Sequence, residues 1–234
     1  SNLDAKLRVQ MRAQLAKLHD TLKTTTVYVT HDQVEAMTLG ERVAVMRDGV
    51  LQQVDTPQNL YGNPSNLFVA AFIGSPPMNL VEANVLDGMV AFAGFEIPMP
   101  DGLDLGDHRG KTLILGIRPS DLEDAAVWSN PELPTIEVTA DVTEELGSEV
   151  NVLFTVDAPP VGVEEVMEAA DEPVEEAVFL LEENRAVFCA RVDARTRARP
   201  GARVRLSVDP RRFHFFDPET NLAIGASKQA TAPA

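Results

Sequence analysis

TTTVYVTHDQVEAM, residues 24–37, changes at His31 from a strand-like to a helix-like pattern. The residues before the histidine are β-branched or aromatic, which favours a short strand, predicted over residues 25–30. Apolar residues after it recur on one helical face, which predicts a helix over about residues 32–39. The sequence therefore places a titratable ring where a strand ends and a helix begins.

The residues around His31 carry the signals of a helix start. Thr30 followed by Gln33 fits a capping box, and Asp32 adds negative charge to the first turn. In open α/β sheets this edge faces ligands, and backbone N–H groups at a helix start favour anions such as phosphate. From the residues alone, two interpretations stay open: His31 supports the turn, or it contacts a bound phosphate group.

The composition sets limits on the class of protein. The 234 residues suffice for one large or two small domains, and 44% of them are hydrophobic. The single cysteine, Cys189, excludes an internal disulfide and fits a reducing compartment; its neighbours read as a strand, which predicts a buried apolar role rather than a nucleophile. No stretch reaches the roughly 20 apolar residues of a membrane span, and the N-terminus lacks the pattern of a signal peptide.

The net charge of −16 is unevenly distributed. Residues 1–75 hold seven basic and seven acidic side chains, whereas residues 76–234 hold thirteen basic and twenty-nine acidic ones. This asymmetry predicts two units. It also predicts no nucleic-acid partner for the second unit, because phosphate binding needs a basic patch.

The pattern over residues 1–75 is that of an α/β segment with too few strands for a complete doubly wound domain. Leucines at three- and four-residue spacing predict a helix over residues 3–23. Two strand-like runs flank Asp48-Gly49, which is a hairpin turn signal. Thr56-Pro57 fits a helix cap followed by a proline at the first helical position. A second short helix is predicted from Asn66 to Ile73.

The pattern changes after Gly74–Asn79, a linker by its turn residues. Short strands separated by Gly, Pro and Asp clusters predict a small barrel or sandwich. The predicted strands cover residues 80–86, 89–93, 112–117, 135–142, 150–156, 186–192 and 203–208. Residues 157–184 hold ten acidic side chains and no Lys or Arg, and are predicted to be a solvated insertion, with a regulator docking site as the alternative. The tail, residues 227–234, is predicted to be disordered.

The sequence contains one near match to a phosphate-binding loop, and it fails. Residues 106–112, GDHRGKT, place three residues between the glycines, whereas a P-loop needs four. The run that follows reads as a strand, whereas a P-loop must open a helix. His19 and His214 are predicted to be structural, and no metal-ligand spacing occurs, so the predicted metal site is none.

Several ordered motifs resemble one protein family over nearly the whole chain. Residues 1–8, SNLDAKLR, resemble the D-loop of an ABC transporter ATPase, and residues 29–37, VTHDQVEAM, resemble its H-loop, which carries the switch histidine. The motifs SPPMN, GIRP, ELGSE and HFFD are similar to the C-terminal regulatory region of the maltose, trehalose and glycerol-phosphate importer ATPases; they begin at Ser75, Gly116, Glu145 and His214.

This resemblance implies a fold and a site. Residues 1–75 would be an α/β remnant of a P-loop NTPase domain, and residues 76–234 an all-β OB-like (TOBE-like) regulatory barrel. His31 would be catalytic: it would face the γ-phosphate of ATP and orient the attacking water and the catalytic carboxylate, since phosphoryl transfer depends on positioning and electrostatics. Ser1, Asn2 and Asp4 would lie at a dimer interface beside the nucleotide.

The resemblance also implies cofactors and partners. The full-length ATPase subunit would use ATP and Mg²⁺, form a dimer with a second copy, and drive transmembrane permease subunits from the cytoplasmic face of the membrane. The Walker A loop, the Q-loop, the LSGGQ signature and the Walker B pair do not occur in this sequence. The chain is therefore expected to be a C-terminal part of such a subunit, to bind no nucleotide alone and to be inactive alone. The alternative interpretation is a free-standing OB-like ligand-binding or regulatory module.

Overall fold

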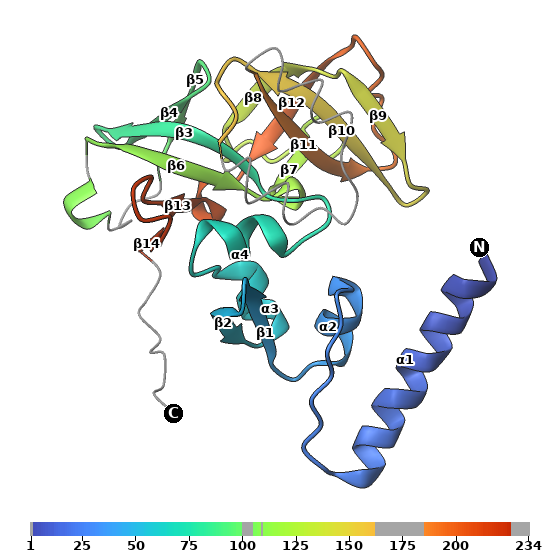
Figure 1. Ribbon diagram of the computed structural model, residues 1–234. Coiled ribbons are helices and arrows are strands. Elements are labelled where there is room, and N and C mark those ends of the chain that lie inside the picture. The colour runs from blue at the N-terminus through green and yellow to red at the C-terminus, as the bar shows by residue number, and fades with distance from the viewer. Residues whose placement is uncertain (1, 100–104, 109, 162–184, 226–234) are drawn as a thin grey trace. The chain divides into compact units, whose positions relative to one another are not determined.

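The computed structural model describes residues 2–99, 105–108, 110–161 and 185–225 (Figure 1). Two compact units are present, residues 1–64 and residues 65–234. This division lies earlier in the chain than the predicted boundary after residue 75. The reason is the helix α4 (Leu67–Phe72), whose apolar side chains pack within the second unit.

The first unit begins with the helix α1 (Asn2–Leu22), as predicted. An extended segment leads from its end to the helix α2 (Gln33–Leu39). The leucine side chains of α1 that the structure describes are exposed; Leu7, Leu18 and Leu22 each show more than half of their surface.

The strand predicted over residues 25–30 is wrong. The segment is extended but forms no strand in the described part of the chain. Val27 and Val29 are 86% and 90% exposed. A strand needs a neighbouring backbone to accept and donate its hydrogen bonds, and local residue preference alone cannot supply one.

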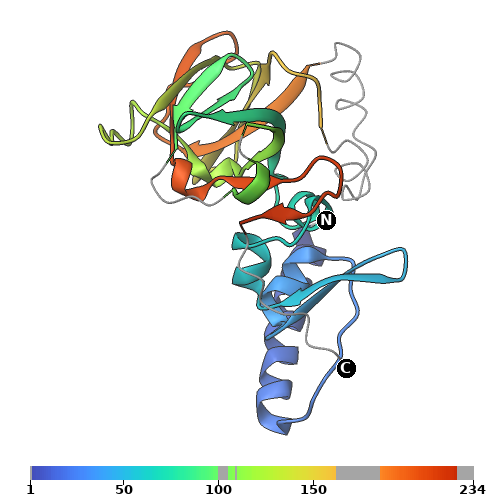
Figure 2. The same cartoon turned by 90° about the vertical axis from the view of Figure 1, so that its left-hand side faces the viewer.

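The predicted hairpin is confirmed (Figure 2). Strands β1 (Val43–Arg47) and β2 (Val50–Asp55) pair in antiparallel fashion around the Asp48-Gly49 turn. Both turn residues have positive φ, 49° and 76°, which is the conformation of the tight hairpin turn that this dipeptide favours. The helix α3 (Pro57–Gly62) follows, and Thr56 caps it by accepting a hydrogen bond from the Asn59 N–H.

The second unit begins with the predicted helix α4 and continues as a β-domain. Asn66 caps α4 by accepting a hydrogen bond from the Val69 N–H. One face of α4 packs on a small apolar cluster formed by Leu67, Ala70, Ala71, Met78, Leu80, Ile114 and Phe216. Helix and strands therefore bury a common surface.

In the described ranges, the β-domain holds three sheets. The largest runs in the order β14-β13-β6-β3-β4-β5, and the two smaller ones in the orders β11-β10-β9 and β7-β12-β8. Their strands are β3 (Asn79–Leu86), β4 (Met89–Phe92), β5 (Phe95–Pro98), β6 (Thr112–Ile117), β7 (Leu122–Asp124), β8 (Thr135–Thr139), β9 (Val142–Glu145), β10 (Glu149–Val156), β11 (Ala186–Asp193), β12 (Arg203–Val208), β13 (His214–Phe216) and β14 (Ala223–Ile224).

Short 3-10 turns connect some of these strands. They are η1 (Gly106–His108), η2 (Pro119–Asp121) and η3 (Pro210–Arg212). All strand pairs in the described sheets are antiparallel. The β-rich second half predicted from the turn spacing is thus confirmed.

One predicted strand, residues 135–142, is divided between two sheets. β8 pairs with β12, and Ala140 continues that pairing by donating to the Ala202 carbonyl. The next residue, Asp141, donates to the Leu153 carbonyl instead, which lies on β10. The chain therefore changes partner between Ala140 and Asp141, as expected where a strand turns the corner of a barrel-like fold.

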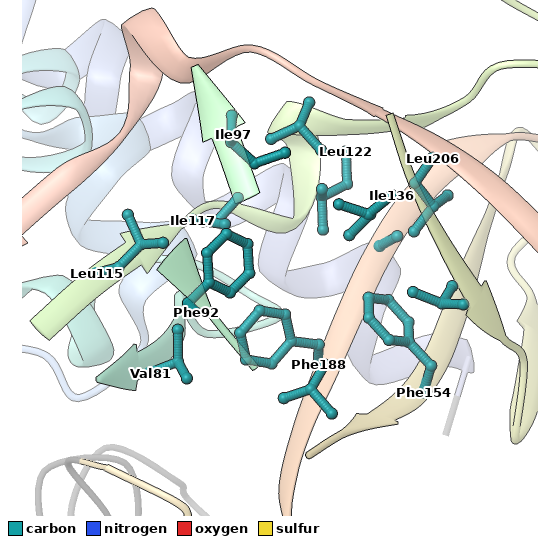
Figure 3. Close-up of a cluster of buried hydrophobic side chains, with 14 of the residues drawn as sticks. Val81, Phe92, Ile97, Leu115, Ile117, Leu122, Ile136, Phe154, Phe188 and Leu206 are labelled. Atoms are coloured by element: carbon teal, nitrogen blue, oxygen red, sulfur yellow. The ribbon is translucent and has the colours of Figure 1, made fainter. Parts of the chain in front are cut away.

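The larger hydrophobic core of the described residues joins the three sheets (Figure 3). Along β11 every second residue is buried, which is the period of a strand with one face on the core. Phe154 and Phe188 lie on neighbouring strands, with ring centroids 5.8 Å apart and planes inclined by 56°. The labelled side chains come from nine strands: Val81, Phe92, Ile97, Leu115, Ile117, Leu122, Ile136, Phe154, Phe188 and Leu206.

Among the described residues, no helix combines the length and the apolar character needed to span a bilayer.

Candidate functional site

His31 lies at a corner of the backbone, between the extended segment and α2. Its side chain is exposed. The imidazole is therefore available to a ligand or to another protein surface. The contact of His31 with a phosphate group stays a prediction.

The cap of α2 differs from the prediction. Asp32, rather than Thr30, is the N-cap residue: its Oδ1 accepts hydrogen bonds from the Val34 N–H at 2.8 Å and the Glu35 N–H at 3.1 Å. A carboxylate at this position satisfies donors that have no partner within the helix. The same contacts weaken the expectation of a phosphate at this helix start, because these two N–H groups are already bonded.

Thr30 has another role at the corner. Its Oγ1 accepts a hydrogen bond from the Asp32 N–H at 3.0 Å and donates one to Glu35 Oε2 at 2.9 Å. The same Glu35 oxygen accepts a hydrogen bond from the Tyr28 hydroxyl at 2.9 Å. This contact raises the pKa of Tyr28, because the ionised ring could not donate and would face a negative charge.

The residues that hold the corner were not found from the sequence. Tyr28, Thr30 and Glu35 belong to an extended segment and a helix, so no strand or helix period relates them. Only the bend at His31 brings the three side chains together. A carboxylate within one helical turn of two hydroxyl residues is too common a pattern to have indicated this arrangement.

The other predicted site residues are Ser1, Asn2 and Asp4. Asn2 and Asp4 lie in the first turn of α1. Ser1 lies outside the described residues. Their place at a dimer interface stays a prediction.

The segment that nearly matches a phosphate-binding loop, residues 106–112, begins with a turn and ends at the start of a strand. Residues 106–108 form the 3-10 turn η1, and Thr112 begins the strand β6 rather than a helix. His108 contacts Asp217 through Nε2 and Oδ2 at 2.9 Å, so it joins two loops of the β-domain. Within the described ranges, no three His, Cys, Asp or Glu side chains are arranged to hold a metal ion.

Cys189 and His214 are two further side chains of a chemically reactive type. Cys189 lies in β11, as predicted, and burial raises the pKa of its thiol to about 12, so it is protonated and a poor nucleophile at neutral pH. His214 is half-buried in β13, and desolvation lowers its pKa to about 4, with Arg118 and Arg212 adding to the effect. Both residues are structural in this fold. His19 lies in the last turn of α1.

The acidic insertion falls largely outside the structure. Residues 157–161 are described, and residues 162–184 lie outside the described residues, as do residues 226–234 of the tail. The insertion and its alternative role as a docking site stay predictions.

Comparison with known proteins shows what the chain is similar to. Residues 74–122 match the family model of the MalK OB fold domain. The trehalose import ATP-binding protein SugC of Mycobacterium tuberculosis (strain CDC 1551 / Oshkosh) is 42% identical over 232 residues, which are 96% of this chain and 58% of SugC. Over 96% of its length this chain is similar to sugar-import ATP-binding proteins.

Other sugar-import ATP-binding proteins match in the same way. The oligosaccharides import ATP-binding protein MsmX of Bacillus subtilis (strain 168) is 38% identical over 229 residues, 96% of this chain and 55% of MsmX. The sn-glycerol-3-phosphate import ATP-binding protein UgpC of Salmonella choleraesuis (strain SC-B67) is 50% identical over 155 residues, 64% of this chain and 41% of UgpC. The chain thus spans about half the length of the curated relatives it matches.

These findings confirm the resemblance that the motifs indicated. They also confirm the fold class, an ATPase-type α/β segment followed by an OB-like β-domain. The matches to SugC and MsmX extend over 96% of the chain, so they include the first unit as well as the β-domain. A free-standing OB-like module is therefore the weaker interpretation, because such a module would not need the first unit.

Proposed function

We propose that this chain is part of the ATP-hydrolysing subunit of a carbohydrate importer, and that it supplies the subunit's switch histidine, His31, and its OB-type regulatory domain. The observation that carries the proposal is a histidine exposed at a backbone corner, in a sequence related over 96% of its length to sugar-import ATP-binding proteins. The expected reaction is transfer of the terminal phosphoryl group of ATP to water, coupled to sugar import.

His31 fits one contact with such a nucleotide. An exposed imidazole can donate a hydrogen bond to a phosphoryl oxygen as negative charge develops on it, and can hold the attacking water in line. Bound ATP with Mg²⁺ would supply the phosphoryl group and the charge that the imidazole faces. The two α2 N–H groups bonded to Asp32 are not available for the same purpose. In this proposal, the His31 side chain is the group at this corner that contacts the phosphoryl group.

The exposed apolar side chains of the first unit support the idea that further protein covers it. Val27 and Val29 are almost fully exposed on an extended segment, and Leu7, Leu18 and Leu22 are exposed on α1. Large exposed apolar patches mark interfaces, and these exposed side chains all belong to the first unit. Because the matched relatives are about twice as long, we infer that the remainder of the ATPase domain packs there and that residues 26–29 pair with one of its strands.

The partners and the location follow from the same proposal. Two ATP-binding subunits would meet near Ser1, Asn2 and Asp4, and transmembrane permease subunits would bind the dimer. The protein would then act at the cytoplasmic face of the membrane, held there by the permease. The cofactors of the complete subunit would be ATP and Mg²⁺.

Substitution of His31 tests the proposal. In the complete subunit, His31→Ala should lower kcat for ATP hydrolysis by about 10²–10³-fold with little change in KM, because such donors act mainly on the transition state. His19→Ala, also in the first unit, is the matched control and should retain wild-type activity. A His31→Ala subunit that hydrolyses ATP at the wild-type rate would refute the assignment.

A further inference from the structure

Glu35 is the meeting point of the hydrogen bonds at the His31 corner. One carboxylate oxygen, Oε2, accepts from the Tyr28 hydroxyl and from Thr30 Oγ1, each at 2.9 Å. Tyr28 and Thr30 lie before the corner, whereas Glu35 lies after it in the first turn of α2. The carboxylate therefore ties the two segments that meet at His31.

The geometry restricts the backbone on both sides of the histidine. Thr30 immediately precedes His31, and its Oγ1 also accepts from the Asp32 N–H, which immediately follows. Asp32 in turn is fixed to α2 by its bonds to the Val34 and Glu35 N–H groups. His31 is thus the exposed residue of a bend whose flanking residues are both held by hydrogen bonds.

A negative carboxylate suits this position better than a neutral group. Hydrogen bonds to a charged acceptor are stronger than bonds between neutral groups, which matters where water competes at a partly exposed site. Tyr28 is 48% exposed, so its hydroxyl could bond to water instead. The charge on Glu35 keeps both hydroxyl groups directed at the same oxygen.

We propose that Glu35 is a positioning residue, which accepts hydrogen bonds from Tyr28 and Thr30 and thereby sets the direction of the His31 imidazole toward its ligand. This inference rests on the proposed function, since it assumes that His31 acts on a phosphoryl group. Glu35 itself touches no substrate in this account. It acts through the backbone on either side of the histidine.

Kinetics of the complete subunit test the inference. Glu35→Ala should lower kcat by about 10–100-fold, the size of effect expected from a small misplacement, with KM for ATP nearly unchanged. Tyr28→Phe and Thr30→Val should each give a smaller loss, and the double variant should approach Glu35→Ala. Glu35→Gln keeps the acceptor oxygen without the charge and should recover part of the activity. Glu41→Gln, an exposed carboxylate just after α2, is the matched control and should behave as wild type.

A double-mutant cycle with His31 separates positioning from a general loss of structure. If Glu35 acts through His31, adding Glu35→Ala to a His31→Ala subunit should change kcat little further, because residues that act as a unit are not additive. An additive loss in the double variant would overturn the inference. So would a wild-type kcat in Glu35→Ala beside an impaired His31→Ala, and that result would leave the proposed function intact. A wild-type kcat in His31→Ala would overturn both.

Nuclear magnetic resonance of the 234-residue chain gives a readout that needs no nucleotide. In the wild type, the His31 Hα–Hβ couplings should report one side-chain rotamer, and the Asp32 amide should be protected from exchange. In Glu35→Ala the couplings should become averaged, while the amides of the last turn of α2 keep their protection. Unchanged His31 couplings in Glu35→Ala would overturn the inference.

Discussion

Two buried polar side chains, Asn79 and Arg118, join separate parts of the β-domain. Asn79 is 5% exposed and exchanges two hydrogen bonds with the backbone of Cys189: its Nδ2 donates to the carbonyl at 2.9 Å, and its Oδ1 accepts from the N–H at 2.7 Å. The amide side chain thus takes the place of a strand neighbour and links β3 to β11. Buried polar groups are stabilising only when they are paired in this way.

Replacing Asn79 should therefore be costly. Asn79→Ala leaves the Cys189 N–H and carbonyl without these partners, and each such buried group costs about 1–3 kcal/mol, so we expect a loss of about 2–4 kcal/mol in the free energy of unfolding. Urea unfolding, followed by the fluorescence of the single tryptophan, Trp128, measures it. Asn84→Ala, an exposed site on the same strand, is the control and should change stability by less than about 0.5 kcal/mol. Equal losses for the two variants would contradict the role given to Asn79.

Arg118 makes a different connection. It is 1% exposed, and its Nη1 donates to the carbonyls of Ala70, at 3.0 Å, and Ile73. Both carbonyls lie at the C-terminal end of α4, where helix carbonyls lack partners within the helix and a positive charge is favourable. This contact helps to explain why α4 is part of the second compact unit.

His214 makes stability depend on pH. Its pKa is about 4 in the folded protein and about 6.5 in an unfolded chain, so between these values the unfolded chain binds a proton that the folded protein excludes. The free energy of unfolding should therefore fall as the pH is lowered from about 7 to about 4. His214 contributes at most roughly 3 kcal/mol to this fall, and it causes no change above pH 7.

The comparison of wild type with His214→Gln isolates this contribution. Burial raises the pKa values of Asp121 and Glu123, and these carboxyl groups act on the pH dependence in the opposite direction. They are present in both proteins, so the difference in unfolding free energy between the two proteins, followed from pH 4 to pH 8, reports His214. An equal pH slope in both proteins would show that His214 is already solvated in the fold.

At the scale of the elements, short sequence signals predict the hairpin turn and the start of a helix well. The Asp48-Gly49 turn and the Thr56 cap occur where the sequence predicts them. Each depends on a few neighbouring residues, which is why it can be predicted. Asp32, and not the predicted Thr30, caps α2. The Thr30 hydroxyl instead donates to Glu35, a contact across the bend that the local sequence pattern does not indicate.

The cap of α2 gives an element-scale prediction. Asp32→Ala removes the acceptor of two helix-start N–H groups and should destabilise the helix by about 1 kcal/mol, which appears as faster hydrogen exchange of the Ala36 and Gly40 amides. Asp32→Asn keeps a side-chain acceptor and should remain close to wild type. Faster exchange in Asp32→Asn of the same size would mean that charge, rather than capping, supports the helix.

At the scale of the whole molecule, the chain carries only part of what an ATPase needs. The sequence contains no phosphate loop, and His31 is the candidate contact to the phosphoryl group among the described residues of the first unit. Phosphoryl transfer needs a phosphate cradle and metal carboxylates in addition to a positioned hydrogen-bond donor.

We therefore expect the 234-residue chain by itself to hydrolyse no ATP above background. A phosphate-release assay measures this, and the complete subunit serves as the positive control. Turnover by the purified chain that is lost in His31→Ala would show that the chain holds a complete active site, contrary to the expectation.

Sequence alone is enough to indicate the resemblance to importer ATPases, the α/β and β-rich parts, the hairpin and the corner at His31. These depend on ordered motifs and on short-range patterns of residues. Three features become visible only in the folded chain: residues 25–30 form no strand, the segment 135–142 divides between two sheets, and Glu35 binds Tyr28 and Thr30. The physical reason is common to all three: backbone and side-chain hydrogen bonds need a partner in space, and the identity of that partner is set by the path of the chain and not by its local composition.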